Sequence, residues 1–292
     1  MIAANEKCPQ PQTQEHLTVL DILGIKNIVI VQNKVDLVSR ERSLENYKEI
    51  AAFVKGSIAE NAPIIPIAAN YKTNIDALIE AIEKNIPTPK RNPDAAPKMF
   101  VARSFDVNRP GVEIAKMRGG VLGGSLICGK LKVGDEIEIR PGIRKKSKDR
   151  EVTEPIITKV TSLLAGEKLA EEVGPGGLVG IGTPLDPALT KSDLFVGNII
   201  GKPGALPQVL EEIDIEYTIL QRQDFENPGY RMQEPIVISV GTATSIGVIT
   251  RLKGGVMQLK LKRPICADKK SKVAISRRVG QRWRLSGHGV LK

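Results

Sequence analysis

A proline-rich, charged stretch at residues 86–93 divides the sequence into two parts whose apolar residues recur with different spacings. Before this stretch, helical spacing is found at residues 13–23, 43–60 and 74–85, and β-branched apolar runs occupy residues 25–31 and 64–67. Helices that alternate with buried strands predict a parallel sheet with helices packed against it. The stretch itself has the composition of a stiff linker.

After the linker, strand signals recur roughly every ten residues with Gly or Pro between them. A second break falls near residues 201–204. This pattern predicts closed antiparallel barrels. We therefore expect an α/β unit at residues 1–89, a linker at 90–97, and two β-barrels at 98–204 and 205–292.

Several classes of protein are excluded by composition. No run approaches the ~18 apolar residues of a membrane span, and the N-terminus does not resemble a signal peptide. Cys8, Cys128 and Cys266 are widely spaced and there are only two histidines, which argues against zinc sites, disulfides and nucleophilic triads. We therefore expect a cytoplasmic protein, and the sequence offers no candidate catalytic residue or metal site.

One motif points to a nucleobase. Asn33-Lys34-Val35-Asp36 directly follows the first predicted strand, and ligands bind beyond the carboxyl ends of parallel strands. The Asp36 carboxylate can accept hydrogen bonds from N1–H and the amino group of guanine, Asn33 can reach N7, and the Lys34 stem can lie across the ring. After the next strand, the loop formed by Ala68, Ala69 and Asn70 can turn a backbone N–H toward O6.

Phosphate-binding parts are not recognisable in these 292 residues. The segment from Gly124 to Lys130 matches seven positions of a P-loop, but Leu131 stands where Ser or Thr must bind magnesium. The following residues read as a turn and a strand, whereas a phosphate-binding loop leads into a helix. The sequence thus predicts base recognition without the phosphate cradle and magnesium site that a GTPase needs.

Positive charge is concentrated toward the C-terminal end. The net charge is +10 overall, and residues 251–292 hold 13 basic side chains against the single acid Asp268. We predict an electrostatic surface for a nucleic-acid backbone at Arg251, Lys253, Lys260, Lys262 and Arg263. A solvated basic face and a docking site for an acidic protein surface remain open as alternatives.

Longer motifs resemble one family along essentially the whole chain. They are residues 5–17 (NEKCPQPQTQEHL), 33–38 (NKVDLV), 62–67 (APIIPI), 103–111 (RSFDVNRPG), 119–125 (GGVLGGS), 174–178 (GPGGL) and 276–278 (SRR). In these motifs the sequence resembles the gamma subunit of archaeal and eukaryotic translation initiation factor two.

The resemblance implies the C-terminal part of a P-loop GTPase domain followed by two barrels similar to those of elongation factor Tu. It implies a GTP-dependent carrier that brings initiator methionyl-tRNA to the small ribosomal subunit, with GTP or GDP and Mg²⁺ bound by the full-length family member. It also implies an alpha subunit on the first barrel and a beta subunit on the GTPase domain. The family has Ser at the position of Ala68, where a hydroxyl would support the guanine loop.

In the family, the P-loop and both switches precede the region where this sequence begins. We therefore expect an N-terminally truncated chain that does not bind guanine nucleotides tightly, and we leave GTP hydrolysis unassigned. The alternative is a non-catalytic fragment that binds tRNA and partner subunits. A related GTPase that carries a specialised tRNA is disfavoured, because residues 5–17 match the initiation factor better.

Overall fold

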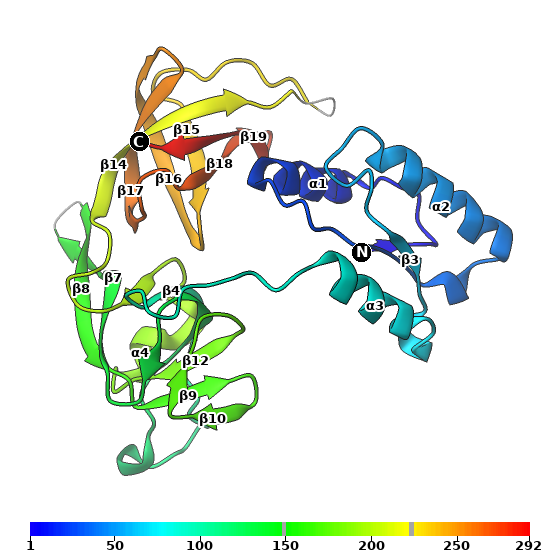
Figure 1. Ribbon diagram of the computed structural model, residues 1–292. Helices are drawn as coiled ribbons and strands as arrows, with labels where there is room; N and C mark the ends of the chain where they lie inside the picture. The colour runs from blue at the N-terminus through cyan, green and yellow to red at the C-terminus, as the bar shows by residue number, and fades with distance from the viewer. Residues whose placement is uncertain (148–149, 222–224) are drawn as a thin grey trace. The chain divides into compact units, whose positions relative to one another are not determined.

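The computed structural model describes residues 1–147, 150–221 and 225–292, which form two compact units, Met1–Lys90 and Arg91–Lys292 (Figure 1). The first unit alternates helices with parallel strands, and the second is built from antiparallel strands. The predicted succession of an α/β part and an all-β part is thus confirmed. The domain boundaries expected at residues 89, 97 and 204 stay predictions.

The first unit contains a three-stranded parallel sheet of order β1-β2-β3. Its elements are β1 (Ile2–Ala3), α1 (Pro11–Leu23), β2 (Ile30–Asn33), α2 (Arg40–Val54), β3 (Ile64–Pro66) and α3 (Ile75–Asn85), with short 3-10 helices at Val35–Leu37 and Ala69–Tyr71. Buried Ile30 from β2 packs with Ile50 and Val54 from α2. The central strand β2 therefore has a partner on each side and α2 packed against it.

The strand predicted at residues 25–31 begins later, at Ile30. Its two neighbours are only two and three residues long, so the ladder has no partner for the preceding residues. Gly24, with a φ of 68°, ends α1, and Ile25 is largely exposed. The β-branched run alone could not show where the partner strands would stop.

Helix α2 begins at Arg40, earlier than the helical spacing at residues 43–60 predicts, because Ser39 caps it. The Ser39 hydroxyl accepts a hydrogen bond from the Arg42 N–H at 3.3 Å. The buried positions of the helix are Asn46, Ile50 and Val54, each separated by four residues. Leu44 and Tyr47, which also follow the helical spacing of residues 43–60, are exposed.

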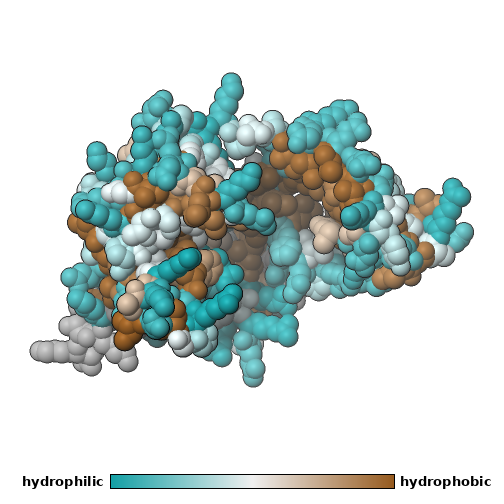
Figure 2. All heavy atoms as spheres, turned by 90° about the horizontal axis from the view of Figure 1, so that it is seen from below, coloured by the Kyte–Doolittle hydropathy of each residue, from teal (hydrophilic) through white to brown (hydrophobic). Residues whose placement is uncertain are grey.

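Helix α3 buries less of its apolar face than the sequence predicts. Ile79 and Ile82 are exposed, and Ala81 is its buried residue. A sheet of three short strands covers only part of such a helix. Figure 2 shows more generally that apolar side chains reach the surface at several places among the polar ones.

The first part of Arg91–Lys292 is an eight-stranded sheet of order β10-β9-β12-β5-β4-β13-β7-β8, accompanied by the pair β11-β6. The strands are β4 (Lys98–Phe105), β5 (Val121–Cys128), β6 (Leu131–Lys132), β7 (Glu136–Ser147), β8 (Arg150–Lys159), β9 (Ser162–Ala165), β10 (Lys168–Ala170), β11 (Glu172–Val173), β12 (Val179–Gly182) and β13 (Ile199–Gly201), with a short helix α4 (Pro187–Thr190) and 3-10 turns at Ile114–Lys116 and Lys191–Asp193. The P-loop-like segment lies at the end of β5 and in the turn to β6, with Gly129 at a φ of 74°. The residues that follow it form β6, a turn and the start of β7, so the predicted turn and strand are confirmed.

The last part is a closed six-stranded barrel of order β14-β17-β16-β15-β18-β19. Its strands are β14 (Val209–Ile219), β15 (Pro235–Val240), β16 (Ala243–Lys253), β17 (Val256–Cys266), β18 (Lys272–Val279) and β19 (Arg282–Leu291). Ile, Leu, Val and Met side chains alternate inward and fill the barrel, so the core is largely aliphatic, as the low aromatic content requires.

A partly buried ion pair holds the connection between these two β parts. Arg140 Nε donates to Glu138 Oε1 at 2.6 Å, and Arg140 Nη1 donates to the carbonyls of Leu206 and Pro207 at 3.2 and 3.1 Å. Glu138 Oε2 in turn accepts from the Gly204 N–H at 2.8 Å. The glycine- and proline-containing break at residues 201–204 is therefore held against β7.

Candidate functional site

The carboxyl ends of β2 and β3 lie side by side in the first unit. The strands are parallel, with Ile30 opposite Ile64 and Gln32 opposite Pro66. Asn33 ends β2, and the 3-10 turn Ala69–Tyr71 follows β3. The structure thus brings together the two loops that the sequence singled out for guanine.

Asn33 joins these loops directly. Its Oδ1 accepts the Lys34 N–H at 2.8 Å and the Ala69 N–H at 3.1 Å. A second connection runs from the Val35 N–H to the Ile67 carbonyl at 3.3 Å. Asn33 Oδ1 is therefore occupied within the protein. Its Nδ2 donates one hydrogen bond to Met1 Sδ at 3.6 Å, so its second N–H is the group left to face a base.

Lys34 and Asp36 are both exposed at this edge. Lys34 adopts a left-handed backbone conformation with a φ of 63°, which turns the chain sharply out of β2 into the 3-10 helix Val35–Leu37. The Asp36 carboxylate has no hydrogen bond or ion pair with any residue that the structure describes. Both carboxylate oxygens can therefore accept from an incoming ligand.

The second loop is closed by its own backbone. Ala68 is buried and forms an isolated bridge with Thr73, and Asn74 Nδ2 donates to the Pro66 carbonyl at 2.8 Å. Because the Ala69 N–H is already bound to Asn33, it is not the donor available for a guanine O6. Within the described chain the Asn70 N–H has no acceptor, so Asn70 is the better candidate.

The five predicted tRNA-contact residues lie on two paired strands of the barrel. Arg251 and Lys253 are on β16, and Lys260, Lys262 and Arg263 are on β17, all with exposed side chains. The acidic strand β14 on the other side of β17 was missed: Arg251 lies 3.6 Å from Asp214, and Lys260 faces Glu212. Strand β14 therefore offsets part of the positive charge.

A cavity of about 680 Å³ in the first β part was not predicted from the sequence. Its walls are mostly apolar and include Phe105, Val121 and Leu164, and Arg103 and Arg118 also line it. Glycines form part of the lining, and a Cβ at Gly124 would lie 1.9 Å from the Phe100 carbonyl oxygen. The only sequence signal was the glycine-rich stretch at residues 119–125, which by itself reads as a strand.

A second, more polar hollow of about 670 Å³ shares Arg103 with the first. Asn108 shapes its loop, because its amide exchanges hydrogen bonds with the Arg118 backbone at 2.7 and 2.8 Å. The Ser104 N–H and then the Arg103 guanidinium hold the pKa of Asp193 below its usual value. The RSFDVNRPG motif thus forms a shaped loop with charged groups fixed at its edge.

Among the residues that the structure describes, no three His, Cys, Asp or Glu side chains are grouped as a metal site would require. No helix within the described ranges is long and apolar enough to cross a membrane.

Three family models match consecutive parts of the sequence. Residues 1–88 match the elongation factor Tu GTP binding domain, residues 119–201 match elongation factor Tu domain 2, and residues 211–291 match the C-terminal region of initiation factor eIF2 gamma. Together they support the predicted order of a GTPase-domain part followed by two further domains.

Similar curated proteins carry the name translation initiation factor 2 subunit gamma. The protein from Archaeoglobus fulgidus is 57% identical over the whole chain, which spans 69% of its length. The protein from Methanocaldococcus jannaschii is 54% identical, again over the whole chain and 72% of its own length.

Among solved structures, the fold resembles translation elongation factor SelB from Methanococcus maripaludis. The apo form gives a TM-score of 0.76, and the complex with the GTP analogue GppNHp gives 0.77, both at 22% identity. The chain is covered completely and spans 63% and 64% of those two chains, less than two thirds of their length. This likeness supports the fold only.

Proposed function

Since the chain belongs to the family of translation initiation factor 2 gamma subunits, we propose that it forms part of a guanine-nucleotide-dependent carrier of initiator methionyl-tRNA. The carrier would deliver this tRNA to the small ribosomal subunit in the cytoplasm. The observation that carries the nucleotide part is the Asn33 side chain, which links the Lys34 and Ala69 backbones while the Asp36 carboxylate stays free.

The site distinguishes bases through hydrogen-bond donors. Guanine offers two adjacent donors, N1–H and the 2-amino group, to the two oxygens of Asp36. Adenine has no matching pair, so the carboxylate would stay unpaired at a cost of ~1–3 kcal/mol. In the proposed complex Asn33 Nδ2 would donate to N7, and the Asn70 N–H would donate to O6.

The residues present fit the base of GTP or GDP but not its phosphates or Mg²⁺. The sequence has no G-x-x-x-x-G-K-[S/T], and the segment that comes nearest to it is a strand and turn. We therefore assign base recognition to these residues and derive no phosphate or magnesium step from them.

The two β parts of Arg91–Lys292 would bind the tRNA. The apolar cavity lined by Phe105, Val121 and Leu164 suits the methionine side chain and terminal adenine, and Arg103 and Arg118 suit the phosphate next to them. The exposed basic residues of β16 and β17 suit a more distant part of the backbone. By the resemblance, an alpha subunit would dock on the first β part and a beta subunit on Met1–Lys90.

The base assignment is tested by Asp36→Asn in a chimera in which the phosphate-binding residues of the Archaeoglobus fulgidus relative are joined ahead of Met1. The variant amide presents a donor to the guanine 2-amino group, whereas xanthine carries an oxygen there. We expect preference to change from GTP to XTP in a competition assay, and Asp21→Asn on α1 to leave it unchanged. A variant that still prefers GTP would refute the assignment.

A further inference from the structure

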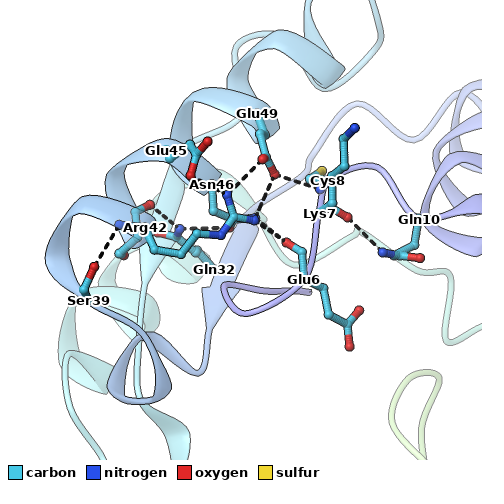
Figure 3. Close-up of polar contacts among 11 residues, drawn as sticks. Glu6, Lys7, Cys8, Gln10, Gln32, Ser39, Arg42, Glu45, Asn46 and Glu49 are labelled. Carbon is cyan, nitrogen blue, oxygen red and sulfur yellow. Dashed lines mark hydrogen bonds and ion pairs between the residues drawn. The ribbon is translucent and has the colours of Figure 1, made fainter.

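A polar network in the first unit links the end of β2 to the segment that precedes α1 (Figure 3). Its side chains come from Gln32 on β2 and from Arg42, Asn46 and Glu49 on α2. Gln32 and Asn46 are almost completely buried, with exposed fractions of 1% and 0%. Buried amides must be hydrogen-bonded to be tolerated, so their partners are fixed.

Gln32 stands immediately before Asn33 and is held on two sides. Its carbonyl accepts the Ile67 N–H at 2.7 Å, at the start of the second guanine loop. Its Nε2 donates to the Ser43 carbonyl at 2.9 Å and to Asn46 Oδ1 at 3.0 Å. Gln32 therefore fixes the end of β2 relative to both the second loop and α2.

Asn46 links Gln32 to residues 6–8 through hydrogen bonds. While its Oδ1 accepts from Gln32, its Nδ2 donates to the Glu6 carbonyl at 2.9 Å. Both ends of one amide are thus used, and neither a carboxylate nor an apolar side chain can replace it fully.

Arg42 and Glu49 also form hydrogen bonds with the backbone of residues 6–8. Arg42 Nη2 donates to the same Glu6 carbonyl at 3.1 Å, and Arg42 Nη1 pairs with Glu49 Oε1 at 2.9 Å. Glu49 Oε2 accepts the Cys8 N–H at 2.8 Å. The hydrogen bonds from Arg42 and then from the Cys8 N–H hold the pKa of Glu49 below its usual value, so Glu49 stays ionised at neutral pH.

Residues 6–8 and the guanine loops are also joined through the backbone. The Ala4 N–H donates to the Asn33 carbonyl at 2.8 Å, just ahead of the anchored segment. A displacement of residues 6–8 must therefore strain either this bond or the network on α2. In both cases the position of Asn33, on which the two loops depend, is affected.

We propose that Gln32, Arg42, Asn46 and Glu49 are positioning residues that couple the conformation of residues 6–8 to guanine binding at residues 33–36. The proposal rests on the guanine-binding role proposed above. Coupling between two sites is reciprocal. If anchoring of residues 6–8 raises the affinity for guanine by some factor, bound guanine should raise the equilibrium constant for anchoring residues 6–8 by the same factor.

The reporter is Cys8, whose N–H bonds to Glu49 and whose side chain is buried. GMP and AMP are titrated into the ¹⁵N-labelled 292-residue chain, and the GMP Kd is taken from the amide shifts of Lys34 and Asp36. Alkylation of Cys8 by iodoacetamide is followed by peptide mass spectrometry with and without GMP. We expect GMP, but not AMP, to slow Cys8 alkylation.

Asn46→Leu should raise the GMP Kd about three- to tenfold through the loss of buried hydrogen bonds, and the slowing of alkylation should disappear. Glu45→Gln is the matched control, because Glu45 is an exposed residue on the same helix whose carboxylate also meets Arg42 Nη1, at 2.9 Å, but in the described part of the chain it forms no hydrogen bond or ion pair with residues 6–8. Should Asn46→Leu fail to fold, Arg42→Lys keeps the charge, cannot reach both Glu6 and Glu49, and should have the same effects in weaker form.

The outcomes separate this proposal from the one on which it rests. GMP binding with unchanged Cys8 alkylation, and an unaltered Kd in the variants, would overturn the coupling and leave the guanine site standing. GMP that moves none of the loop amides would overturn both. A destabilised but uncoupled variant would keep the parent GMP Kd in its folded fraction, which also counts against the proposal.

Discussion

At the scale of single residues, two buried thiols and one buried phenol make the stability of the fold sensitive to alkaline pH. Burial raises the pKa of Cys8 and of Cys266 to about 11 and that of Tyr230 to about 12. The Tyr230 hydroxyl lies 2.9 Å from Ser286 Oγ, and the Arg277 guanidinium stacks over its ring. None of these groups can ionise without disturbing its surroundings.

The sign of the effect follows from where protons are lost first. In the unfolded chain, thiols ionise near pH 9 and the phenol near pH 10, below the folded pKa values. The unfolded state therefore gains stability from about pH 9 upward, and the free energy of unfolding should fall between pH 9 and 12. Urea denaturation at several pH values measures this. With Tyr230→Phe, the free energy of unfolding should fall less steeply between pH 10 and 12. A dependence on pH equal to that of the parent protein in this range would contradict the prediction.

At the scale of elements, β17 lies between a basic strand and an acidic one. Simultaneous charge reversal of Lys260, Lys262 and Arg263 should lower tRNA affinity and flatten its salt dependence, by ~0.7–0.9 in slope for each phosphate that is no longer neutralised. Because Glu212 already faces Lys260, we expect the decrease to be smaller than the change in charge alone would give. Filter binding across a salt series measures both quantities.

The control for this strand must carry the same change in net charge. Lys48, Lys55 and Lys84 are exposed on the helical unit, and their reversal alters the total charge equally. If both triple variants lose affinity alike, the effect is one of net charge and β17 is not a binding surface. Loss of binding to an acidic protein, with tRNA affinity intact, would favour the alternative that the sequence left open.

At the scale of the whole molecule, base contacts alone should support only weak nucleotide binding by the 292-residue chain. A few hydrogen bonds of ~0.5–3 kcal/mol each, less the entropy of association, correspond to a Kd of about 1 mM or weaker. We expect a fluorescent GDP analogue to show such binding without dependence on magnesium. Micromolar, magnesium-dependent binding would reveal a phosphate site among residues in which we recognise none.

The architecture could be predicted because it depends on repeating patterns. The change in periodicity at residues 86–93 separated the α/β part from the strands, and the position of Asn33 after an apolar run placed the base motif at a strand end. Contacts across long sequence separations could not be predicted, because they depend on strand register. The hydrogen bond from Ala69 to Asn33, the acidic neighbour of β17 and the cavity beside Gly124 all belong to this second kind.

The anchored connection at Arg140 and Glu138 has a geometric consequence for any long ligand. A free linker would let the cavity of the first β part and the outer strands of the barrel sample many separations. Here the Leu206 and Pro207 carbonyls and the Gly204 N–H are held by side chains of β7. The connection itself is therefore fixed to the first β part and does not behave as a free linker. A ligand that contacts both β parts gains from both at once only if its two contact points match a separation that this connection allows.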